Sequence, residues 1–220
     1  MGFLDFLFGT AKNIASNAAH DAAYSAARRA MDRAMSGSPL DLGNSASGTG
    51  FGGMQADSHT INIIRIPRDL DDMKALPQAS LSNEFDVAAL CVAVLANFET
   101  DRNATIEMLN YLRGPRPLSN YDVQFLSERL SGKPYKMMSF FNGSSPDNEY
   151  TPSQPLTITV ASNPYSYQNE GYATLWLRSS GADSPMPLSL RKKPSTGQWF
   201  VWEITCLADV REPASQDPWK

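Results

Sequence analysis

The stretch Asn83-Glu-Phe-Asp-Val-Ala-Ala-Leu-Cys-Val-Ala-Val-Leu-Ala-Asn-Phe98 decides how this chain folds. After a polar start it is apolar at nearly every position, and asparagine is a favoured residue at the N-terminus of a helix. The run is shorter than the roughly 20 apolar residues that cross a bilayer. It therefore predicts a helix that begins after Asn83 and is buried in the core of a folded domain.

The residues beyond position 155 alternate between apolar and polar with a period of two, which is typical of strands. The pattern predicts strands at about 156–160, 172–178, 186–190 and 198–207. The connections between the last three runs are short and rich in Gly, Pro, Ser and Asp. Short connections favour an antiparallel meander of about four strands.

Helical patterns dominate the residues ahead of these strands. We expect a short strand at 61–66, a helical piece at 69–76, and helices that begin after Asn103 and after Ser119, where Asp122 completes a capping box. Helices that precede strands in the chain favour an α+β fold. About three to four helices should pack on one face of the C-terminal meander, and a separate N-terminal helix should precede the domain.

The predicted sheet has one apolar face and one mixed face. The apolar face, which should meet the helices, takes Leu156, Ile158, Val160, Ala173, Leu175, Leu177, Met186, Leu188, Leu190, Phe200, Trp202, Ile204 and Cys206. The other face carries rings, cations and hydroxyls, a mixture that binding surfaces use. Its candidate partner- or ligand-binding residues are Tyr172, Trp176, Arg178, Arg191, Trp199 and Glu203. Two alternatives need no ligand: residues 140–155, with Phe140, Phe141 and Tyr150, could cover these rings, or cross-strand pairs could simply stabilise the sheet.

The first 56 residues differ in composition from the rest of the chain. Residues 1–35 predict an amphipathic Ala-rich helix, residues 36–56 are a Gly/Ser-rich linker, and residues 57–212 form the globular domain, followed by a tail at 213–220. The helix could dock on its own domain, associate with other copies, or insert its apolar tip into a membrane surface. Candidate residues for self-association or membrane contact are Phe3, Leu4, Phe6, Leu7, Phe8, Ala15, Ala19, Ala22 and Ala26.

Composition excludes several classes of protein. The 220 residues carry a net charge of −4 and 42 % hydrophobic residues, so the chain is neither wholly disordered nor a general binder of nucleic acid. The two cysteines, Cys91 and Cys206, are expected to be buried free thiols in a reducing compartment. The start of the chain has no basic segment before its apolar residues, so we expect no secretory signal. These features favour a cytoplasmic protein, with the membrane surface as an alternative location.

The residues from about 84 to 219 resemble an uncharacterised bacterial family that is described only as a domain of unknown function. The resemblance rests on Ser139-Phe-Phe-Asn-Gly-Ser-Ser-Pro146, Asn163-Pro-Tyr-Ser-Tyr167, Gly171-Tyr-Ala-Thr-Leu-Trp-Leu177, Ser179-Ser-Gly-Ala-Asp-Ser-Pro185, Lys193-Pro-Ser-Thr-Gly-Gln-Trp-Phe200 and Asp217-Pro-Trp219. It implies a bacterial, intracellular protein. No activity is assigned to that family, so the resemblance identifies no catalytic residues.

The sequence offers little for catalysis. The two histidines are His20, outside the domain, and His59 at its start, and no Cys or His pair has metal-ligand spacing. No nucleotide-binding glycine motif is present. We therefore expect no cofactor, no metal and no catalytic residue, and hypothesise a non-enzymatic binding or scaffold module that uses a protein partner or self-association. The alternatives are a small-molecule enzyme with an acidic pocket between helices and sheet, and a peripheral membrane protein.

Overall fold

A computed structural model describes residues 57–218 of the chain. The expected N-terminal helix, the Gly/Ser-rich linker and the last two residues of the tail lie outside these described residues. The candidate self-association residues between Phe3 and Ala26 therefore remain predictions from the sequence. Everything below concerns the described part.

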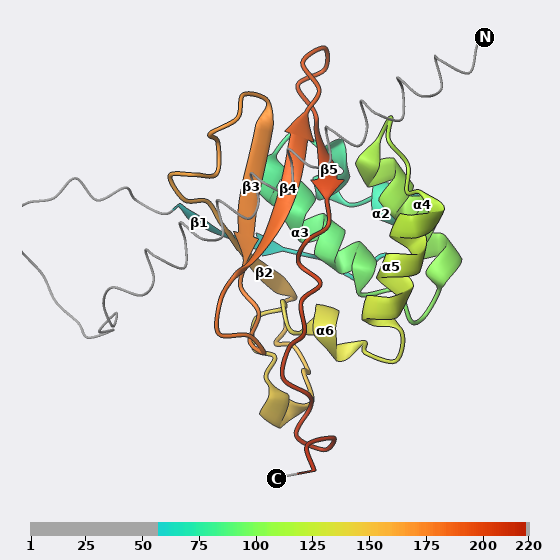
Figure 1. Cartoon of the computed structure of the whole chain (residues 1–220), viewed down its shortest axis with the longest axis vertical. Helices are drawn as coiled ribbons and strands as arrows, with labels where there is room; N and C mark the ends of the chain where they lie inside the picture. The colour runs from blue at the N-terminus through green and yellow to red at the C-terminus, as the bar shows by residue number, and fades with distance from the viewer. Residues whose placement is uncertain (1–56, 219–220) are drawn as a thin grey trace, which may run out of the picture. The chain divides into compact units, whose positions relative to one another are not determined.

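A five-stranded antiparallel sheet forms one layer of the domain (Figure 1). Its order follows the chain: β1 (Ser58–Asn62), β2 (Thr157–Ala161), β3 (Tyr172–Leu177), β4 (Met186–Lys192) and β5 (Trp199–Glu203). The fold is α+β, and the C-terminal antiparallel meander is confirmed. One strand, β1, precedes the helices and pairs with β2 at the edge of the sheet.

The predicted strand at 61–66 occurs earlier in the chain than expected. Its ladder with β2 runs from Ser58 to Asn62, and Asn62 pairs with Thr157, the first residue of β2. Since β2 offers no further strand residue, the chain leaves the sheet there. Ile63 then enters the core, and its backbone N–H donates to the carbonyl of Leu156 over 2.8 Å.

Five helices of the described residues pack beside and behind this sheet: α2 (Leu70–Lys74), α3 (Glu84–Leu95), α4 (Arg102–Arg113), α5 (Asn120–Leu130) and α6 (Tyr135–Met138), with 3₁₀ turns η1 (Pro77–Ser80) and η2 (Pro146–Asn148). Helix α3 is the predicted core helix. It contacts all five strands and α4, and its residues from Val87 to Leu95 are buried. The hydrophobic core therefore lies around α3, behind the sheet in Figure 1.

Two of the three predicted helix starts are confirmed. The Asn83 side chain accepts hydrogen bonds from the first turn of α3, and Ser119 and Asp122 form the capping box of α5. The prediction at Asn103 is wrong. The cap of α4 is Asp101, whose carboxylate accepts from the N–H of Ala104 over 2.9 Å. Asp101 is an equally good capping residue, so propensity alone cannot choose between the two positions.

The face assignment of the last strand is also wrong. A register shift between Ser189 and Leu190 places Leu190 opposite Val201. Trp199 and Val201 are consequently buried against the core, and Trp202 and Phe200 are only half-buried. In the run Trp199-Phe-Val-Trp202 the odd-numbered and the even-numbered residues are equally apolar, so the sequence does not indicate which of them face the core. The bulge between β4 and β5 then exchanges the two faces relative to the predicted pattern.

A buried lysine fastens the segment that follows β5. Lys136 of α6 is 1 % exposed, and its ammonium donates to the carbonyls of Arg129 and Leu207 and to the carboxylate of Asp209, at 3.1, 3.0 and 3.0 Å. Further along, the hydroxyl of Tyr150 donates to the carbonyl of Arg211 over 2.6 Å. The C-terminal segment is therefore built into the domain.

Both cysteines are buried free thiols, as expected. Burial raises the pKa of Cys206 to about 12 and the pKa of Cys91 well above its ordinary value. Both therefore stay protonated near neutral pH, and a protonated thiol is a poor nucleophile.

Candidate functional site

The outer face of the sheet, opposite α3, carries the mixed side chains that the sequence predicted for it. Along β3 the residues alternate strictly between half-buried and buried, with Tyr172, Thr174 and Trp176 in the half-buried set. Arg191 of β4 stands across from this strand, and its partner in the register is Tyr172. This face is the starting point of the candidate site.

Two of these side chains, Tyr172 and Arg191, join Trp202 of β5 and Arg116 of the connection between α4 and α5. We call these four residues the cation–π ladder. The guanidinium carbon of Arg191 lies 5.3 Å from the centre of the Tyr172 ring and 4.8 Å from that of Trp202. The guanidinium carbon of Arg116 lies 4.4 Å from the centre of the Trp202 ring. The two rings meet edge to face, 5.7 Å apart. Rings and cations thus alternate across four separate segments of the chain: β3, β4, β5 and the connection between α4 and α5.

The two cations of the ladder have no anionic partner among residues 57–218. Neither Arg116 nor Arg191 takes part in a described ion pair or donates a side-chain hydrogen bond there, and both are exposed. A cation over an aromatic face gains about 0.5–1 kcal/mol at an exposed site. The rings therefore orient the guanidinium groups and leave their N–H donors available.

The three aromatic side chains of residues 140–155 do not cover the rings of Tyr172 and Trp202. Phe140 and Phe141 belong to the hydrophobic core. Tyr150 is buried, and its ring stacks on that of Tyr135 at 5.8 Å. The rings of Tyr172 and Trp202 contact each other and the guanidinium groups of Arg116 and Arg191.

The structure places the predicted binding residues unevenly. Tyr172 and Arg191 belong to the ladder, Trp176 lies on the same face, and Arg178 is exposed just beyond the end of β3. The prediction that Trp199 belongs to the outer face is corrected. Trp199 is 7 % exposed and faces the core, and its backbone N–H donates to the carbonyl of Leu81. Glu203 follows Trp202 directly in the chain and lines a neighbouring cleft.

Sequence analysis missed two members of the ladder. Trp202 was assigned to the core because the bulge before Leu190 leaves no signature in the sequence. Arg116 lies in the connection between α4 and α5, within Gly114-Pro-Arg-Pro117, and nothing in its spacing indicates that it returns over β5. An Arg between two prolines, just after a glycine stop, is the only signal that could have drawn attention to it.

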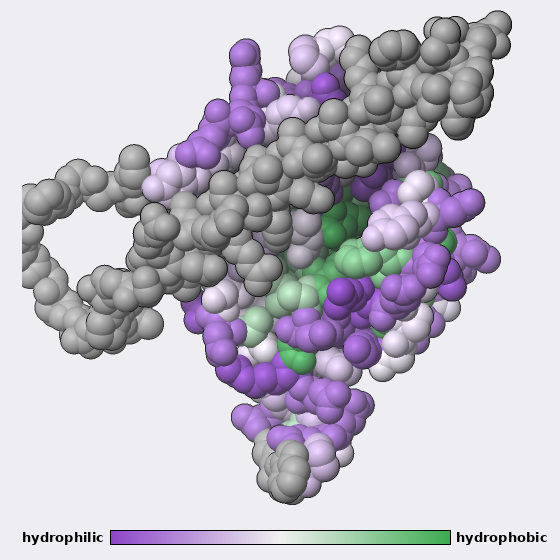
Figure 2. All heavy atoms as spheres, viewed as in Figure 1, coloured by the Kyte–Doolittle hydropathy of each residue, from purple (hydrophilic) through white to green (hydrophobic). Residues whose placement is uncertain are grey.

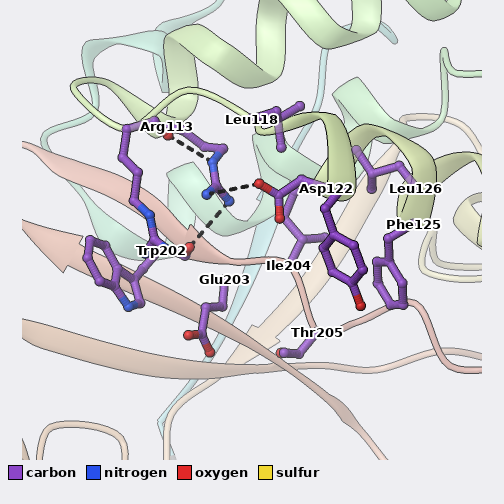
Figure 3. A pocket seen from close by; sticks show the side chains of 11 residues that line it. Arg113, Leu118, Asp122, Phe125, Leu126, Trp202, Glu203, Ile204 and Thr205 are labelled. Atoms are coloured by element: carbon purple, nitrogen blue, oxygen red, sulfur yellow. Dashed lines mark hydrogen bonds and ion pairs between the residues drawn. The ribbon is translucent and has the colours of Figure 1, made fainter. Parts of the chain in front are cut away.

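A cleft of about 270 Å³ adjoins the ladder, between the end of β5 and the start of α5 (Figure 3). Arg116 and Trp202 belong to both. The lining residues are Arg113, Arg116, Leu118, Tyr121, Asp122, Phe125, Leu126, Trp202, Glu203, Ile204 and Thr205. In Figure 2, apolar side chains reach the surface near this region and are bordered by hydrophilic residues.

Arg113 is the buried charge of this cleft, with 6 % of the residue exposed. Its Nε donates to the carbonyl of Arg116 over 3.0 Å and its Nη1 to the carbonyl of Trp202 over 3.3 Å. Its Nη2 stands 3.9 Å from Asp122, too far for a hydrogen bond. Burial lowers the pKa of Arg113, and the carboxylates of Asp122 and Glu203 act in the opposite direction.

A glycine shapes the chain between the two arginines of the cleft. Helix α4 ends at Arg113, and Gly114 adopts φ +59° and ψ −119°, a conformation that glycine alone takes readily. Its Cα packs closely against the ring of Phe200 in β5. The turn brings Arg116 back over the sheet, and Ser119 then begins α5.

Two of the sequence strings quoted above serve the fold. Ser139 and Ser179 share a hydrogen bond of 2.7 Å, and Ser144 and Ser180 share one of 3.1 Å. The backbone of Ser180 also donates to the carbonyl of Ser139. These hydroxyls join the end of α6 to the turn after β3, and no histidine takes part in the network. The residues of these two stretches, 139–146 and 179–185, therefore hold two segments of the fold together.

Comparison with known proteins gives one match. A family model described as "Domain of unknown function (DUF6935)" matches residues 65–214, which include every residue of the ladder and the cleft and leave out β1. No curated protein and no solved structure matches the chain. Within residues 57–218, no helix is long and apolar enough to cross a membrane, and no group of three His, Cys, Asp or Glu residues could hold a metal ion.

Proposed function

The chain belongs to the family described as a domain of unknown function, DUF6935, and from that premise we propose that it is a non-enzymatic binding module whose cation–π ladder receives carboxylates of a protein partner. The observation that carries this proposal is the state of Arg116 and Arg191. Both are held by Trp202 and lack an anionic partner in the described part of the chain. They stand ready for an acidic ligand.

The ladder favours binding because it lowers the entropy cost of ordering the two arginine side chains. A long arginine side chain loses conformational entropy when it is fixed in an interface. The rings of the ladder fix Arg116 and Arg191 in advance, which reduces that cost, and aromatic and arginine side chains are enriched in binding hot spots. Each guanidinium can then form paired hydrogen bonds with a carboxylate. The partner therefore presents Asp or Glu side chains on an extended or helical segment.

Binding fits the cleft better than catalysis does. General acid–base chemistry needs a positioned group that is free to exchange a proton. Asp122 is engaged by the backbone N–H and the hydroxyl of Ser119, both at 2.8 Å, and the Thr205 hydroxyl donates to Pro187 over 2.7 Å. Of the two carboxylates of the cleft, Glu203 is the one with no hydrogen-bond partner among residues 57–218. One carboxylate without an acid–base partner supports a binding role.

We expect a blocked hexaglutamate peptide to bind the full chain, as measured by titration calorimetry, and to bind more weakly as salt rises, because exposed charges are screened. Arg191→Gln and Arg116→Gln should each weaken binding about five- to tenfold, the effect of one charge-assisted hydrogen bond. Arg102→Gln is the matched control, since Arg102 stands over Phe98 at 5.7 Å, away from the ladder.

Three results would count against this proposal. A blocked hexaglutamine peptide that binds equally well would show that charge plays no part. Equal losses in Arg102→Gln and Arg191→Gln would show that the ladder is not the site. Tighter binding of a short oligothymidine than of hexaglutamate would favour a nucleic acid partner instead.

We also propose that residues 3–35 bring copies of the module together, which would raise the effective concentration of ladders at a multivalent partner. This part rests on the sequence pattern alone, with Ala15, Ala19, Ala22 and Ala26 on one helical stripe. Light scattering should show an oligomer for the full chain and a monomer for a chain that begins at Ala56. Two monomers would contradict this role. We further propose a cytoplasmic location, which the two buried free thiols support because free thiols persist in a reducing compartment.

A further inference from the structure

The cleft between β5 and α5 has a chemistry different from that of the ladder. One part of its wall is apolar and aromatic, formed by Leu118, Tyr121, Phe125, Leu126 and Ile204. The rest holds two guanidinium groups and two carboxylates (Figure 3). Its volume of about 270 Å³ lies just below the range of roughly 300–1,000 Å³ that is typical of ligand pockets. A ligand must be compact and must be partly apolar.

The cationic side of the cleft has donors to spare. Arg113 is buried, yet no described residue accepts a hydrogen bond from its Nη2, and the nearest carboxylate oxygen is 3.9 Å away on Asp122. That oxygen already accepts two hydrogen bonds from Ser119. Arg116, the second cation, pairs with no carboxylate of the described part. Together they can receive one carboxylate from a ligand.

The anionic side of the cleft also has hydrogen-bonding capacity that no described residue uses. Glu203 is half-buried, and its carboxylate takes part in no hydrogen bond or ion pair with residues 57–218. Since Asp122 is occupied by Ser119, Glu203 is the carboxylate with the most capacity left. A half-buried carboxylate gains from a cationic partner. An ammonium group is the complement that a small ligand can supply.

These charges discriminate between classes of ligand. A simple anion in the cleft would meet Asp122 and Glu203, and a simple cation would meet Arg113 and Arg116. Placing like charges together is a common means of rejecting the wrong ligand. A ligand that carries an ammonium and a carboxylate on one carbon atom, together with an apolar remainder, satisfies all three parts of the wall.

We propose that this cleft is a binding site for a small zwitterion with an apolar side chain, of the amino-acid class, with its carboxylate toward Arg113 and Arg116, its ammonium toward Glu203 and its side chain among Phe125 and Ile204. The site shares Arg116 and Trp202 with the ladder. Arg191 of the ladder does not line the cleft and Glu203 does not belong to the ladder, so variants at these two positions test the two proposals separately.

The test is a calorimetric titration of the full chain with L-phenylalanine as the probe. Hydrocinnamate, which lacks the ammonium, and phenethylamine, which lacks the carboxylate, should each bind at least about tenfold more weakly. Glu203→Gln and Arg116→Gln should each weaken L-phenylalanine binding by a similar factor. Arg191→Gln is the control and should leave it unchanged. L-aspartate, with a polar side chain, should bind more weakly than L-phenylalanine.

Two outcomes overturn the inference. If no heat of binding is seen at about 10 mM L-phenylalanine, the cleft does not take this class of ligand. If hydrocinnamate binds as tightly as L-phenylalanine and Glu203→Gln has no effect, the site takes simple anions. Loss of peptide binding in Arg191→Gln with unchanged phenylalanine binding would separate the two sites.

Discussion

Replacing Lys136 with methionine should lower the free energy of unfolding by about 2–4 kcal/mol. The methionine fills similar space but donates no hydrogen bond, so the carbonyls of Arg129 and Leu207 lose their partner in the interior. Each buried polar group left unsatisfied costs about 1–3 kcal/mol. Removal of the desolvated ammonium offsets part of this cost. Urea denaturation should show a lower midpoint with an unchanged slope.

Lys133→Met is the matched control for this variant. Lys133 approaches the same carboxylate of Asp209 at 3.8 Å, but its side chain is 42 % exposed. Pairs of this kind contribute about 0–1 kcal/mol. If Lys136→Met were as stable as Lys133→Met, the buried ammonium would not hold the C-terminal segment in place.

The pH dependence of Asp209→Asn provides a second check on the same contact. The hydrogen bond from Lys136 lowers the pKa of Asp209 in the folded state. Its contribution is therefore complete above the unfolded pKa of about 3.9 and is lost as the pH falls through the lower, folded pKa. The stability difference between the native chain and Asp209→Asn should be constant near neutral pH and shrink below about pH 4. A difference that stayed the same at lower pH would contradict the ionic contact.

Gly114→Ala should cost about 3 kcal/mol or more. The residue has φ +59° and ψ −119°, where a side chain is strained, and a Cβ there would lie within 2.5–2.6 Å of two ring carbons of Phe200. The Phe200 ring must shift to make room for the added methyl group, so backbone strain and overpacking add. Because Gly114 lies between Arg113 and Arg116, the variant should also weaken binding at the ladder. Thermal and urea unfolding measure the first effect, and the hexaglutamate titration measures the second.

Gly132→Ala separates the two causes. Gly132 also has a positive φ, +73°, but nothing lies within 4 Å of the position of its Cβ. Only the backbone term remains there, about 1–2 kcal/mol. Equal losses in the two variants would mean that the contact between Gly114 and Phe200 is not the cause.

The sequence predicted those parts of the fold that depend on local chemistry. The apolar run after Asn83 predicted the core helix because no other arrangement buries so many apolar residues in succession. Ser119 and Asp122 predicted the start of α5 because the capping box is a contact between neighbours in the chain. The alternation along β3 and β4 predicted both faces of the sheet, since polar residues occupy one parity there.

The sequence could not predict the parts that depend on distant segments. The bulge that turns Trp202 outward arises from pairing between β4 and β5, which their composition does not determine. Arg116 reaches the ladder only because Gly114 redirects the chain after α4. Nothing in the sequence indicates that Lys136 is buried, and two of its three acceptors, on Leu207 and Asp209, lie more than 70 residues away in the chain. Two of the four ladder residues, Trp202 and Arg116, could therefore not be predicted from the sequence.

The most direct test of the central claim, that the cation–π ladder binds carboxylates, is a nuclear magnetic resonance titration of the ¹⁵N-labelled full chain with blocked hexaglutamate. The indole signals are assigned with Trp202→Phe and Trp199→Phe. We predict that the Trp202 indole signal shifts progressively to saturation, because the two receiving guanidinium groups lie 4.4 and 4.8 Å from the centre of its ring. The signal of Trp199, buried on the opposite face, should stay in place. A Trp202 signal that does not move, or that moves no more than that of Trp199, would contradict the claim.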